Sequence, residues 1–520
     1  MRLTAATARN YRQRAQGSSI PAPVGGWDRS SPLAAMDPKR AIVLDNWFPQ
    51  ASYIELRKGH AEHSDTGETV AVKTIMAYHS ATTGSDKLFA ISNDTIYDVT
   101  TSTAAATSVT TLTEPYAQHV NFTTAAGNFL FVVNGADNPV HYNGSAWANP
   151  AITGVTESDF VNVWVHKKRL FFAENDSTKI WYLPVDSVAG AASSFEFGSL
   201  MDLGGYIMAG GSWSFDGGSG PDDHFVVVTS QGQVIVFAGD DPSDVNAWSH
   251  VGTYNLPRPI GRRCIIKMAG DLVVLTEAGV LPLSKALIRD TNVDDIALSA
   301  RIQDAFNDAF RNYGTNKGWQ IVSYPRGHMV IVNVPITEGS LQHQYVVNSL
   351  TGAWCRFTGQ NSYCWTVYRN RLFFGGNAGI VYEADIAAED DGTPITADLK
   401  TAFNYFGNPG LMKRFQMLQP VIYADGAVAQ GVTLNVDFED SVPEAILAGE
   451  SVSTALWDVA VWDVDTWPVE QEVERPWQSV PGIGYCAAVR VRVIGYATSS
   501  VPLTMQLNGF NITFEKGGFI

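Results

Sequence analysis

The 520-residue chain lacks a run of about 18 consecutive apolar residues, the length that a membrane-spanning helix needs. Its N-terminus is basic but has no apolar core of the kind found in secretory signals, so we expect this segment to be retained. Hydrophobic residues nevertheless make up 45% of the chain, which is enough for an ample core. The composition therefore predicts a globular protein of two or three domains that does not span a membrane.

Cysteine is also scarce. The four cysteines are Cys264, Cys355, Cys364 and Cys486. None of them forms a CxxC pair, and four are too few to hold a chain of this length as a disulfide scaffold. We expect reduced thiols that fill the core of a protein made in the cytosol.

The common catalytic motifs are missing as well. The chain has no nucleophile elbow, P-loop, HExxH or dinucleotide-binding fingerprint, and no turn motif of the sialidase-like propellers. A pair of carboxylates for glycoside hydrolysis stays open, because distant segments can bring such a pair together. We expect no enzymatic activity and no cofactor, with a glycan-binding or glycan-cleaving protein as the alternative.

Two segments carry metal-ligating residue types without the matching spacing. His60, Glu62 and His63, followed by Asp65, lack the helical spacing that would hold a metal ion. The Gly-rich stretch from Asp216 to Asp223 lacks the spacing of a helix–loop–helix calcium site, and we interpret it as a loop between repeats. We expect no metal site at either place.

The net charge of −17 is unevenly distributed. Eleven acidic residues and no basic residue occur between Asp437 and Glu474. Residues 1–16 show the opposite pattern, with no acidic residue and the four arginines Arg2, Arg9, Arg12 and Arg14. An acidic body repels phosphates, so this basic arm is the one segment that we expect to contact nucleic acid or an acidic protein surface.

A repeated hairpin dominates the middle of the chain. Arg169–Tyr182 reads as an apolar run, an Asn-Asp-Ser corner and a second apolar run, and the same pattern returns at Arg371–Tyr382. Looser copies place the first apolar position of each hairpin at 88, 129, 170, 225, 272, 329 and 372. From 88 to 372 this makes six steps of about 47 residues each, a period typical of propeller blades.

We therefore predict an all-β chain with a β-propeller of six or seven blades over residues 67–394, in preference to a β-sandwich. Each blade is one small antiparallel sheet that must stack on its neighbours, and closing the ring removes most exposed edges. Apolar residues recur at helical spacing from Ile302 to Phe310, with Gly314 as a stop. This pattern predicts a single helix inserted between two blades.

The N-terminal residues 1–66 are predicted to form an extended basic arm and a tether. The Pro- and Gly-rich stretch Ile20–Trp27 is incompatible with a helix or a central strand. Asp37 followed by Pro38 predicts a short helix that continues through Leu44. The segment Tyr53–Arg57 alternates in the manner of a strand.

Residues 395–520 are predicted to form a separate antiparallel β domain, with strands at Val432–Phe438, Ala487–Val493 and Leu503–Phe514. This region also holds three tryptophans at a step of five, Trp457, Trp462 and Trp467. One interpretation is a hairpin edge folded onto the domain. The other is a subunit contact, because buried tryptophans dominate the energy of many interfaces.

Short blocks form a further pattern from about residue 25 to 467. They read GGWD (25–28) followed by DP (37–38), LDNWFP (44–49), ELRKG (55–59), GWQ (318–320), VNVP (332–335), NSLTGAWCRF (348–357), FNYFG (403–407) and KRF (413–415), together with the Trp-Asp repeat. In these blocks the chain resembles the tail nozzle (tail tubular B-like) proteins of short-tailed, podovirus-type bacteriophages. The blocks are structural motifs, and none of them is catalytic.

This resemblance implies a structural protein of the virion that is assembled in the host cytoplasm. It implies a homo-hexameric ring in the viral tail, below the portal and adaptor proteins, that forms the lower tail tube for genome ejection. It also implies contacts with tail fibre, spike or needle proteins, and DNA that passes through the lumen without specific binding. We expect the lumen to be acidic, and the basic arm to dock on the adaptor, the portal or the next subunit.

Overall fold

The computed structural model describes residues 15–103, 105–106, 112–216, 221–268, 270–286, 296–424, 428–443, 472–474, 477–495 and 504–517. Contacts between residues divide the chain into two compact units. The larger unit is Lys58–Thr393, and the smaller unit combines Met1–Arg57 with Pro394–Ile520. Within the described part of the chain, no helix is long and apolar enough to cross a membrane.

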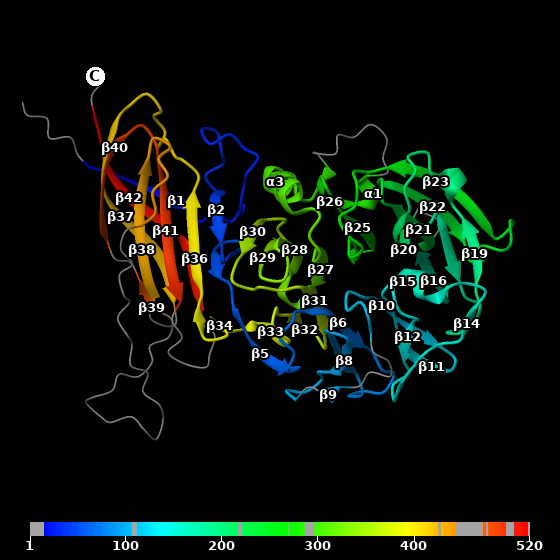
Figure 1. Ribbon diagram of the computed structural model, residues 1–520. Coiled ribbons are helices and arrows are strands. Elements are labelled where there is room, and N and C mark those ends of the chain that lie inside the picture. The colour runs from blue at the N-terminus through cyan, green and yellow to red at the C-terminus, as the bar shows by residue number, and fades with distance from the viewer. Residues whose placement is uncertain are drawn as a thin grey trace, which may run out of the picture. The chain divides into compact units, whose positions relative to one another are not determined.

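The larger unit consists of seven small antiparallel sheets among its described residues (Figure 1). The first four are β6 (Val72–Tyr78), β7 (Lys87–Ser92), β8 (Thr95–Asp98) and β9 (Ala105–Ala106); β10 (Gln118–Thr124), β11 (Gly127–Val133), β12 (Val140–Tyr142) and β13 (Trp147–Ala148); β15 (Phe160–His166), β16 (Arg169–Glu174), β17 (Lys179–Tyr182) and β19 (Ser193–Glu196); and β20 (Ile207–Asp216), β21 (Pro221–Thr229), β22 (Gln233–Gly239) and β23 (Trp248–Asn255). A short parallel pair, β14 (Ile152–Thr153) and β18 (Gly190–Ala191), lies outside these sheets.

The remaining three sheets complete the unit. They are β24 (Ile265–Met268), β25 (Asp271–Thr276) and β26 (Gly279–Pro282); β27 (Gln320–Tyr324), β28 (Met329–Thr337), β29 (Leu341–Asn348) and β30 (Trp354–Phe357); and β31 (Cys364–Tyr368), β32 (Arg371–Gly375), β33 (Ile380–Ala387) and β5 (Gly59–Asp65), extended by β34 (Glu389–Asp390) and β35 (Thr393–Pro394). The first strands of successive sheets contact one another in the order β6, β10, β15, β20, β24, β27 and β31, and β31 contacts β6 again. This closed ring makes the unit a β-propeller of seven blades, which confirms the predicted fold class.

The ring closes through a strand from the beginning of the unit. β5 pairs antiparallel with β33, with Ile380 opposite Asp65 and Ala384 opposite His60. The last blade is therefore built from three strands near the end of the unit and one strand near its start. Such pairing leaves no open edge between the first and last blades.

The repeated hairpins of the sequence are the second and third strands of the blades. β16 pairs with β15 and β17, and β32 pairs with β31 and β33 in the same order. The expected equivalence of the Phe171–Phe172 and Phe373–Phe374 strands is confirmed. All four side chains are buried, because a second strand has a neighbour on each side and packed side chains on both faces. This double burial explains why these strands read as continuous apolar runs.

The predicted helix is α3 (Gln303–Tyr313), which follows the short η3 (Ala300–Ile302) and lies between β26 and β27 in the chain. It buries Ala305, Phe306 and Ala309, and the ring of Phe306 contacts the rings of Tyr345 and Trp354 edge-on. The prediction of a helix inserted between two blades is confirmed. The other described helical segments are the four-residue α1 (Leu283–Ala286) and the short η1 (Glu157–Asp159), η2 (Gly198–Leu200) and η4 (Pro325–Gly327).

The described residues of the smaller unit form two antiparallel sheets. One has the order β3 (Trp47–Pro49), β4 (Ile54–Leu56), β42 (Met505–Lys516), β37 (Lys413–Ala424) and β39 (Glu472–Glu474), with β1 (Gln16–Pro21) on β42 and β40 (Gln478–Gly484) on β37. The other has the order β2 (Ala41–Asp45), β36 (Thr396–Thr401), β41 (Ala487–Gly495) and β38 (Val428–Val436). Burial alternates along β41 and β42, so each sheet buries one face.

The N-terminal part of the chain differs from the prediction. In place of a tether through residue 66, β1 to β4 join the sheets of the smaller unit and β5 joins the propeller. The helix predicted over Asp37–Leu44 is wrong, because β-branched Ile42 and Val43 lie in β2, which pairs with β36. Asp37 caps only a turn, where its carboxylate accepts a hydrogen bond from the backbone N–H of Lys39 at 2.8 Å.

Other local predictions agree with the structure. The strand expected at Tyr53–Arg57 is β4, and the three strands expected in the C-terminal region are β38, β41 and β42. All four cysteines are buried and outside disulfide bonds, as expected for thiols that fill the core. Burial raises the pKa of the Cys264 thiol to about 12. The arm itself, residues 1–14, lies outside the described residues.

One buried histidine of the propeller predicts an acid sensitivity. His166 Nε2 lies 3.0 Å from the carbonyl oxygen of Gly239, and Nδ1 lies 3.0 Å from Ser212 Oγ. Because a carbonyl only accepts, the neutral ring donates from Nε2 and accepts at Nδ1. Burial lowers the pKa of His166 to about 4 from its ordinary 6.5. The unfolded chain therefore binds a proton that the folded chain does not, and stability is lost as the pH falls from 6.5 towards 4.

We expect this effect to reach about 3 kcal/mol in the free energy of unfolding. Urea denaturation of the wild type and of the non-titrating variant His166→Gln at pH 7 and pH 4.5 measures it. The variant starts less stable at pH 7 but loses less stability on acidification. Equal losses in the two proteins would show that His166 does not titrate in this range.

Candidate functional site

A cavity of about 230 Å³ lies where the first strands of the seven blades meet. Each of these strands contributes lining residues, for example Gln118 and His119 on β10 and Gln320 on β27. Arg262 and Arg263, in the segment that enters β24, complete the lining. We call this space the inner cavity.

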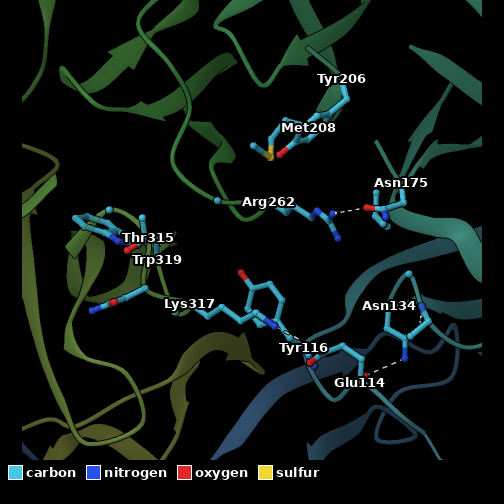
Figure 2. A pocket seen from close by; sticks show the side chains of 17 residues that line it. Glu114, Tyr116, Asn134, Asn175, Tyr206, Met208, Arg262, Thr315, Lys317 and Trp319 are labelled. Atoms are coloured by element: carbon cyan, nitrogen blue, oxygen red, sulfur yellow. Dashed lines mark hydrogen bonds and ion pairs between the residues drawn. The ribbon is translucent and has the colours of Figure 1, made fainter. Parts of the chain in front are cut away.

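A second cavity of about 410 Å³, the outer pocket, is lined mainly by the segments that enter the blades and by turns between their strands (Figure 2). Glu114 and Tyr116 precede β10, Arg262 precedes β24, and Lys317 precedes β27. Arg262 lines both cavities, so the outer pocket adjoins the inner cavity on one side of the propeller.

The two cavities carry the opposite charge to the chain. Their described lining holds Arg262, Arg263 and Lys317, and a single carboxylate, that of Glu114. The whole chain has a net charge of −17. A concave site with an excess of cations inside an acidic protein concentrates small anions from solution.

Arg263 is held by contacts to two other blades. Its guanidinium lies 4.2 Å from the ring centroid of Tyr116. Its Nη2 donates to the carbonyl oxygens of Lys73 at 3.1 Å and Ala117 at 2.9 Å, and to Thr74 Oγ1 at 2.8 Å. The side chain is therefore fixed in one orientation before any ligand arrives.

Arg262 and Lys317 extend into the outer pocket (Figure 2). Arg262 Nη2 donates to Asn175 Oδ1 at 3.0 Å, and Lys317 Nζ forms an ion pair with Glu114 at 3.2 Å. Burial lowers the pKa of Arg262, but a guanidinium starts so high that it stays charged. In the outer pocket, the charge of Lys317 is thus neutralised by Glu114, whereas Arg262 donates to the neutral amide of Asn175.

His119 does not add to this charge. Burial, together with the charges of Arg263 and His79, lowers the pKa of His119 to about 3. Its imidazole is therefore neutral near pH 7, and the positive charge of the inner cavity comes from the two arginines.

Two further lining residues are Cys364 of the inner cavity and Glu114 of the outer pocket. Burial raises the pKa of the Cys364 thiol to about 11, so it carries no thiolate nucleophile near neutral pH. Glu114 is the single carboxylate of the described lining, whereas hydrolysis of a glycoside by the usual route needs two. The arrangement offers fixed hydrogen-bond donors and positive charge.

The residues singled out as contact candidates in the sequence are not among these. Arg2, Arg9, Arg12 and Arg14, and likewise Trp457, Trp462 and Trp467, lie outside the described residues. Arg262 and Arg263 were missed by the sequence reasoning. The available signal was a pair of adjacent arginines after a glycine, directly before an apolar strand in an acidic chain.

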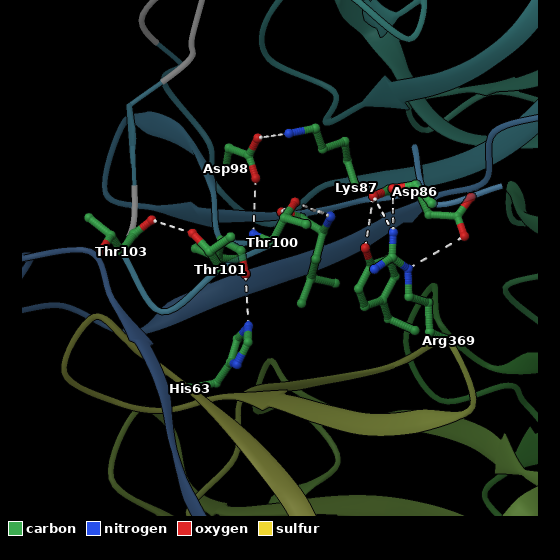
Figure 3. Close-up of polar contacts among 12 residues, drawn as sticks. His63, Asp86, Lys87, Asp98, Thr100, Thr101, Thr103 and Arg369 are labelled. Carbon is green, nitrogen blue, oxygen red and sulfur yellow. Dashed lines mark hydrogen bonds and ion pairs between the residues drawn. The ribbon is translucent and has the colours of Figure 1, made fainter. Parts of the chain in front are cut away.

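The histidines considered as metal ligands have other partners. His60 lies 3.0 Å from Asp390 and packs edge-on against Phe374 and Tyr382. His63 Nε2 lies 3.0 Å from the carbonyl oxygen of Val99 in the first blade (Figure 3). In the described part of the chain, no group of three His, Cys, Asp or Glu residues could hold a metal ion.

The stretch Asp216–Asp223 is not a loop between blades as predicted. Asp216 ends β20 and Pro221 begins β21, and the two residues pair within one blade. The stretch therefore connects two paired strands of one blade instead of two blades. Residues 217–220 lie outside the described residues.

The fold and the site define a seven-bladed β-propeller protein with a second antiparallel β unit. Among solved structures the chain is similar to YCF48 from Cyanidioschyzon merolae, with a TM-score of 0.39 and 10% sequence identity over 63% of this chain and 98% of that chain. It is also similar to YCF48 bound to D1 peptide, with a TM-score of 0.38 and 10% identity over 68% of this chain and 99% of that chain. No protein-family model matches the chain, and the comparison with curated proteins gives no match.

Proposed function

We propose that the chain is the structural subunit of a tail nozzle of a short-tailed bacteriophage. Six copies would form a ring below the portal and adaptor, and the ring would channel DNA during ejection and anchor tail fibres or spikes. The sequence blocks that resemble the nozzle proteins support this proposal. The observation that carries it further is the narrowness of the propeller's own channel.

The inner cavity of about 230 Å³ has room for only on the order of eight water molecules. By contrast, a single major groove of duplex DNA is about 12 Å wide. DNA therefore cannot pass along the axis of one propeller. A chain of this fold can serve a DNA tube only as a wall, with the lumen between several copies.

Two of the blocks meet in the smaller unit and have a structural role there. Asn46 of the LDNWFP block has a left-handed backbone conformation with φ of 60°, and its Oδ1 accepts a hydrogen bond from Arg57 Nε of the ELRKG block at 2.8 Å. Asn46 Nδ2 donates to the carbonyl oxygen of Thr396 at 2.8 Å. Trp47 and Phe48 are buried beside this turn. The two blocks thus join the N-terminal segment of the smaller unit to β36.

Two further blocks, NSLTGAWCRF and KRF, contain side chains that bind backbone carbonyl groups. Trp354 of the NSLTGAWCRF block is buried, and its Nε1 donates to the carbonyl oxygen of Leu298 at 2.8 Å. Lys413 of the KRF block is fully buried, and its Nζ donates to the carbonyl oxygens of Asn408, Leu411 and Tyr485 at 2.7–2.9 Å. Residues of this kind preserve a rigid building block, which is what a tail subunit needs.

The charge of the chain suits the same role. A lumen lined by acidic residues repels the DNA backbone, so the genome slides without sticking. Six copies of a chain with a charge of −17 supply ample acidic surface for such a lining. Arg2, Arg9, Arg12 and Arg14 are our candidates for contacts with the adaptor or portal, and Trp457, Trp462 and Trp467 for contacts between subunits or with tail fibres.

Native mass spectrometry of the purified full-length protein tests the proposal. We expect a species of six times the chain mass of 56.4 kDa at micromolar concentration. A protein that stays monomeric under all solution conditions would contradict the proposal. A monomer that binds polysaccharide would favour the glycan-binding alternative instead.

A further inference from the structure

Two buried hydrogen-bond donors of the inner cavity have no acceptor among the described residues. They are Nη1 of Arg263 and Nε2 of Gln118. Gln118 is 8% exposed, and both side chains line the inner cavity. Buried donors in folded proteins are nearly always paired, and an unpaired guanidinium nitrogen is the more unusual of the two. The two donors therefore mark a position where an acceptor is needed.

The charge of the cavity specifies what kind of acceptor fits. No carboxylate belongs to the described lining of the inner cavity, although Arg262 and Arg263 both do. Glu114 of the outer pocket is engaged by Lys317 at 3.2 Å. The guanidinium of Arg263 thus lies in a cavity whose described lining supplies no carboxylate, while Arg262 extends into the adjoining outer pocket. Burial lowers the pKa of His119, and the charge of Arg263 lowers it further.

The two donors of the inner cavity are held in fixed positions. Arg263 cannot turn away, because Nη2 and the ring of Tyr116 hold it from two sides. Gln118 lies on β10, the first strand of the second blade, and pairs with Val133. The donors come from two different parts of the ring and converge on one space. Such preorganised donors lose little entropy when a ligand binds.

We propose that the inner cavity of the propeller is a binding site for a small oxyanion, a carboxylate or phosphate. Nη1 of Arg263 and Nε2 of Gln118 donate to its oxygens, and Arg262 balances its charge from the side of the outer pocket. Nη1 can donate to one oxygen of either group, because an ionised carboxylate or phosphate is a strong acceptor for a charged donor. A volume of about 230 Å³ admits an anion of a few heavy atoms, which identifies the ligand as a free small anion.

This anion-binding site is a further property of the chain, and it does not depend on the proposed structural role in a phage tail. A bound anion would bridge the segment that enters the fifth blade and the first strand of the second blade. It would therefore stabilise the closed ring, and the thermal midpoint would rise with anion concentration because only the folded chain forms the site.

Isothermal titration calorimetry of the full-length protein with malonate, and separately with inorganic phosphate, tests the proposal. Sodium chloride at matched ionic strength is the reference. We expect saturable binding of one anion per chain, weakened by added salt as for any charge-assisted contact. The near-isosteric Gln118→Glu places a carboxylate beside the two arginines, and we expect it to weaken binding by about tenfold or more.

Two further variants complete the design. Gln231→Glu makes the same change in the turn between β21 and β22, which is not part of either cavity lining, and it should bind like the wild type. Gln118→Leu removes the donor without adding charge and should weaken binding less than Gln118→Glu. Circular dichroism confirms that each variant folds. Absence of saturable heat with both anions, or unchanged affinity in both Gln118 variants, would overturn the proposal.

Discussion

Replacing Gly59 with alanine is expected to lower the free energy of unfolding by about 3 kcal/mol. Gly59 begins β5, the strand that completes the seventh blade. A Cβ atom at this position would lie 1.9 Å from the carbonyl oxygen of Glu389 and 2.4 Å from its carbonyl carbon. Both are backbone atoms, so the clash is relieved only by moving one strand away from the other. The substitution therefore separates β5, the closing strand of the ring, from β34, which pairs with β5 on the side away from β33.

Contacts between the first and last blades depend on the same closure. Tyr368 and Arg369 of the seventh blade donate hydrogen bonds to backbone carbonyl oxygens of the first blade, at Gly84 and Asp86 (Figure 3). We expect the Gly59→Ala protein to unfold at lower urea concentration and to be cleaved faster by protease. The matched control is Gly17→Ala, which also changes a strand glycine but meets no atom within 4 Å. Equal stability of the two variants would show that the close contact between β5 and β34 does not contribute to stability.

Asn333→Ala is expected to cost about 4 kcal/mol, the largest loss that we predict for a polar side chain. Asn333 Nδ2 donates to the carbonyl oxygens of Gly318 at 2.9 Å and Ser362 at 3.0 Å. Its Oδ1 accepts hydrogen bonds from Gln344 Nε2, Ser362 Oγ and Trp365 Nε1 at 2.8–3.1 Å. Removing this side chain leaves several buried polar groups without a partner, and each of them costs free energy.

The network also supports the wall of the inner cavity. Trp365 lines that cavity and is joined to Gln320 by hydrogen bonds in both directions. Asn333→Ala should therefore weaken malonate binding as well as stability. Asn246→Ala, at an exposed position of the β22–β23 connection, should stay within about 0.5 kcal/mol of the wild type in urea denaturation. A similar small effect at Asn333 would show that the network is not essential.

The propeller could be predicted because its second strands are buried on both faces. Each reads as a short apolar run next to a polar corner, and seven such runs at a regular step allow few other folds. The number of blades followed only from the structure. The blade with the weakest sequence pattern has three strands among the described residues, β24 to β26, and the segment that contains α3 follows it in the chain.

The closing strand was missed for a physical reason. β5 carries two histidines and two acidic residues, and nothing in its local pattern indicates a partner more than 300 residues away. Pairing of this kind is decided by the ring as a whole. β2 was mistaken for a helix because Asp37 and Pro38 give a true capping signal, which here ends in a single turn before Ile42 and Val43 enter a sheet.

The inner cavity also could not be predicted from the sequence. Arg262 and Arg263 are close to Gln118 only because the ring brings the second and fifth blades to a common axis. Sequence alone indicates that two adjacent arginines precede a strand. It does not show that one of them reaches Thr74 and Ala117 while leaving Nη1 without an acceptor.

Electron cryomicroscopy of the purified assembly tests the central claim most directly. We predict six-fold rings in which the lumen lies between the copies, is lined mainly by acidic residues and is wide enough for duplex DNA, while the channel of each propeller stays closed by side chains. Single propellers without rings, or a lumen lined by lysine and arginine, would contradict a role as the wall of a DNA-conducting tail nozzle.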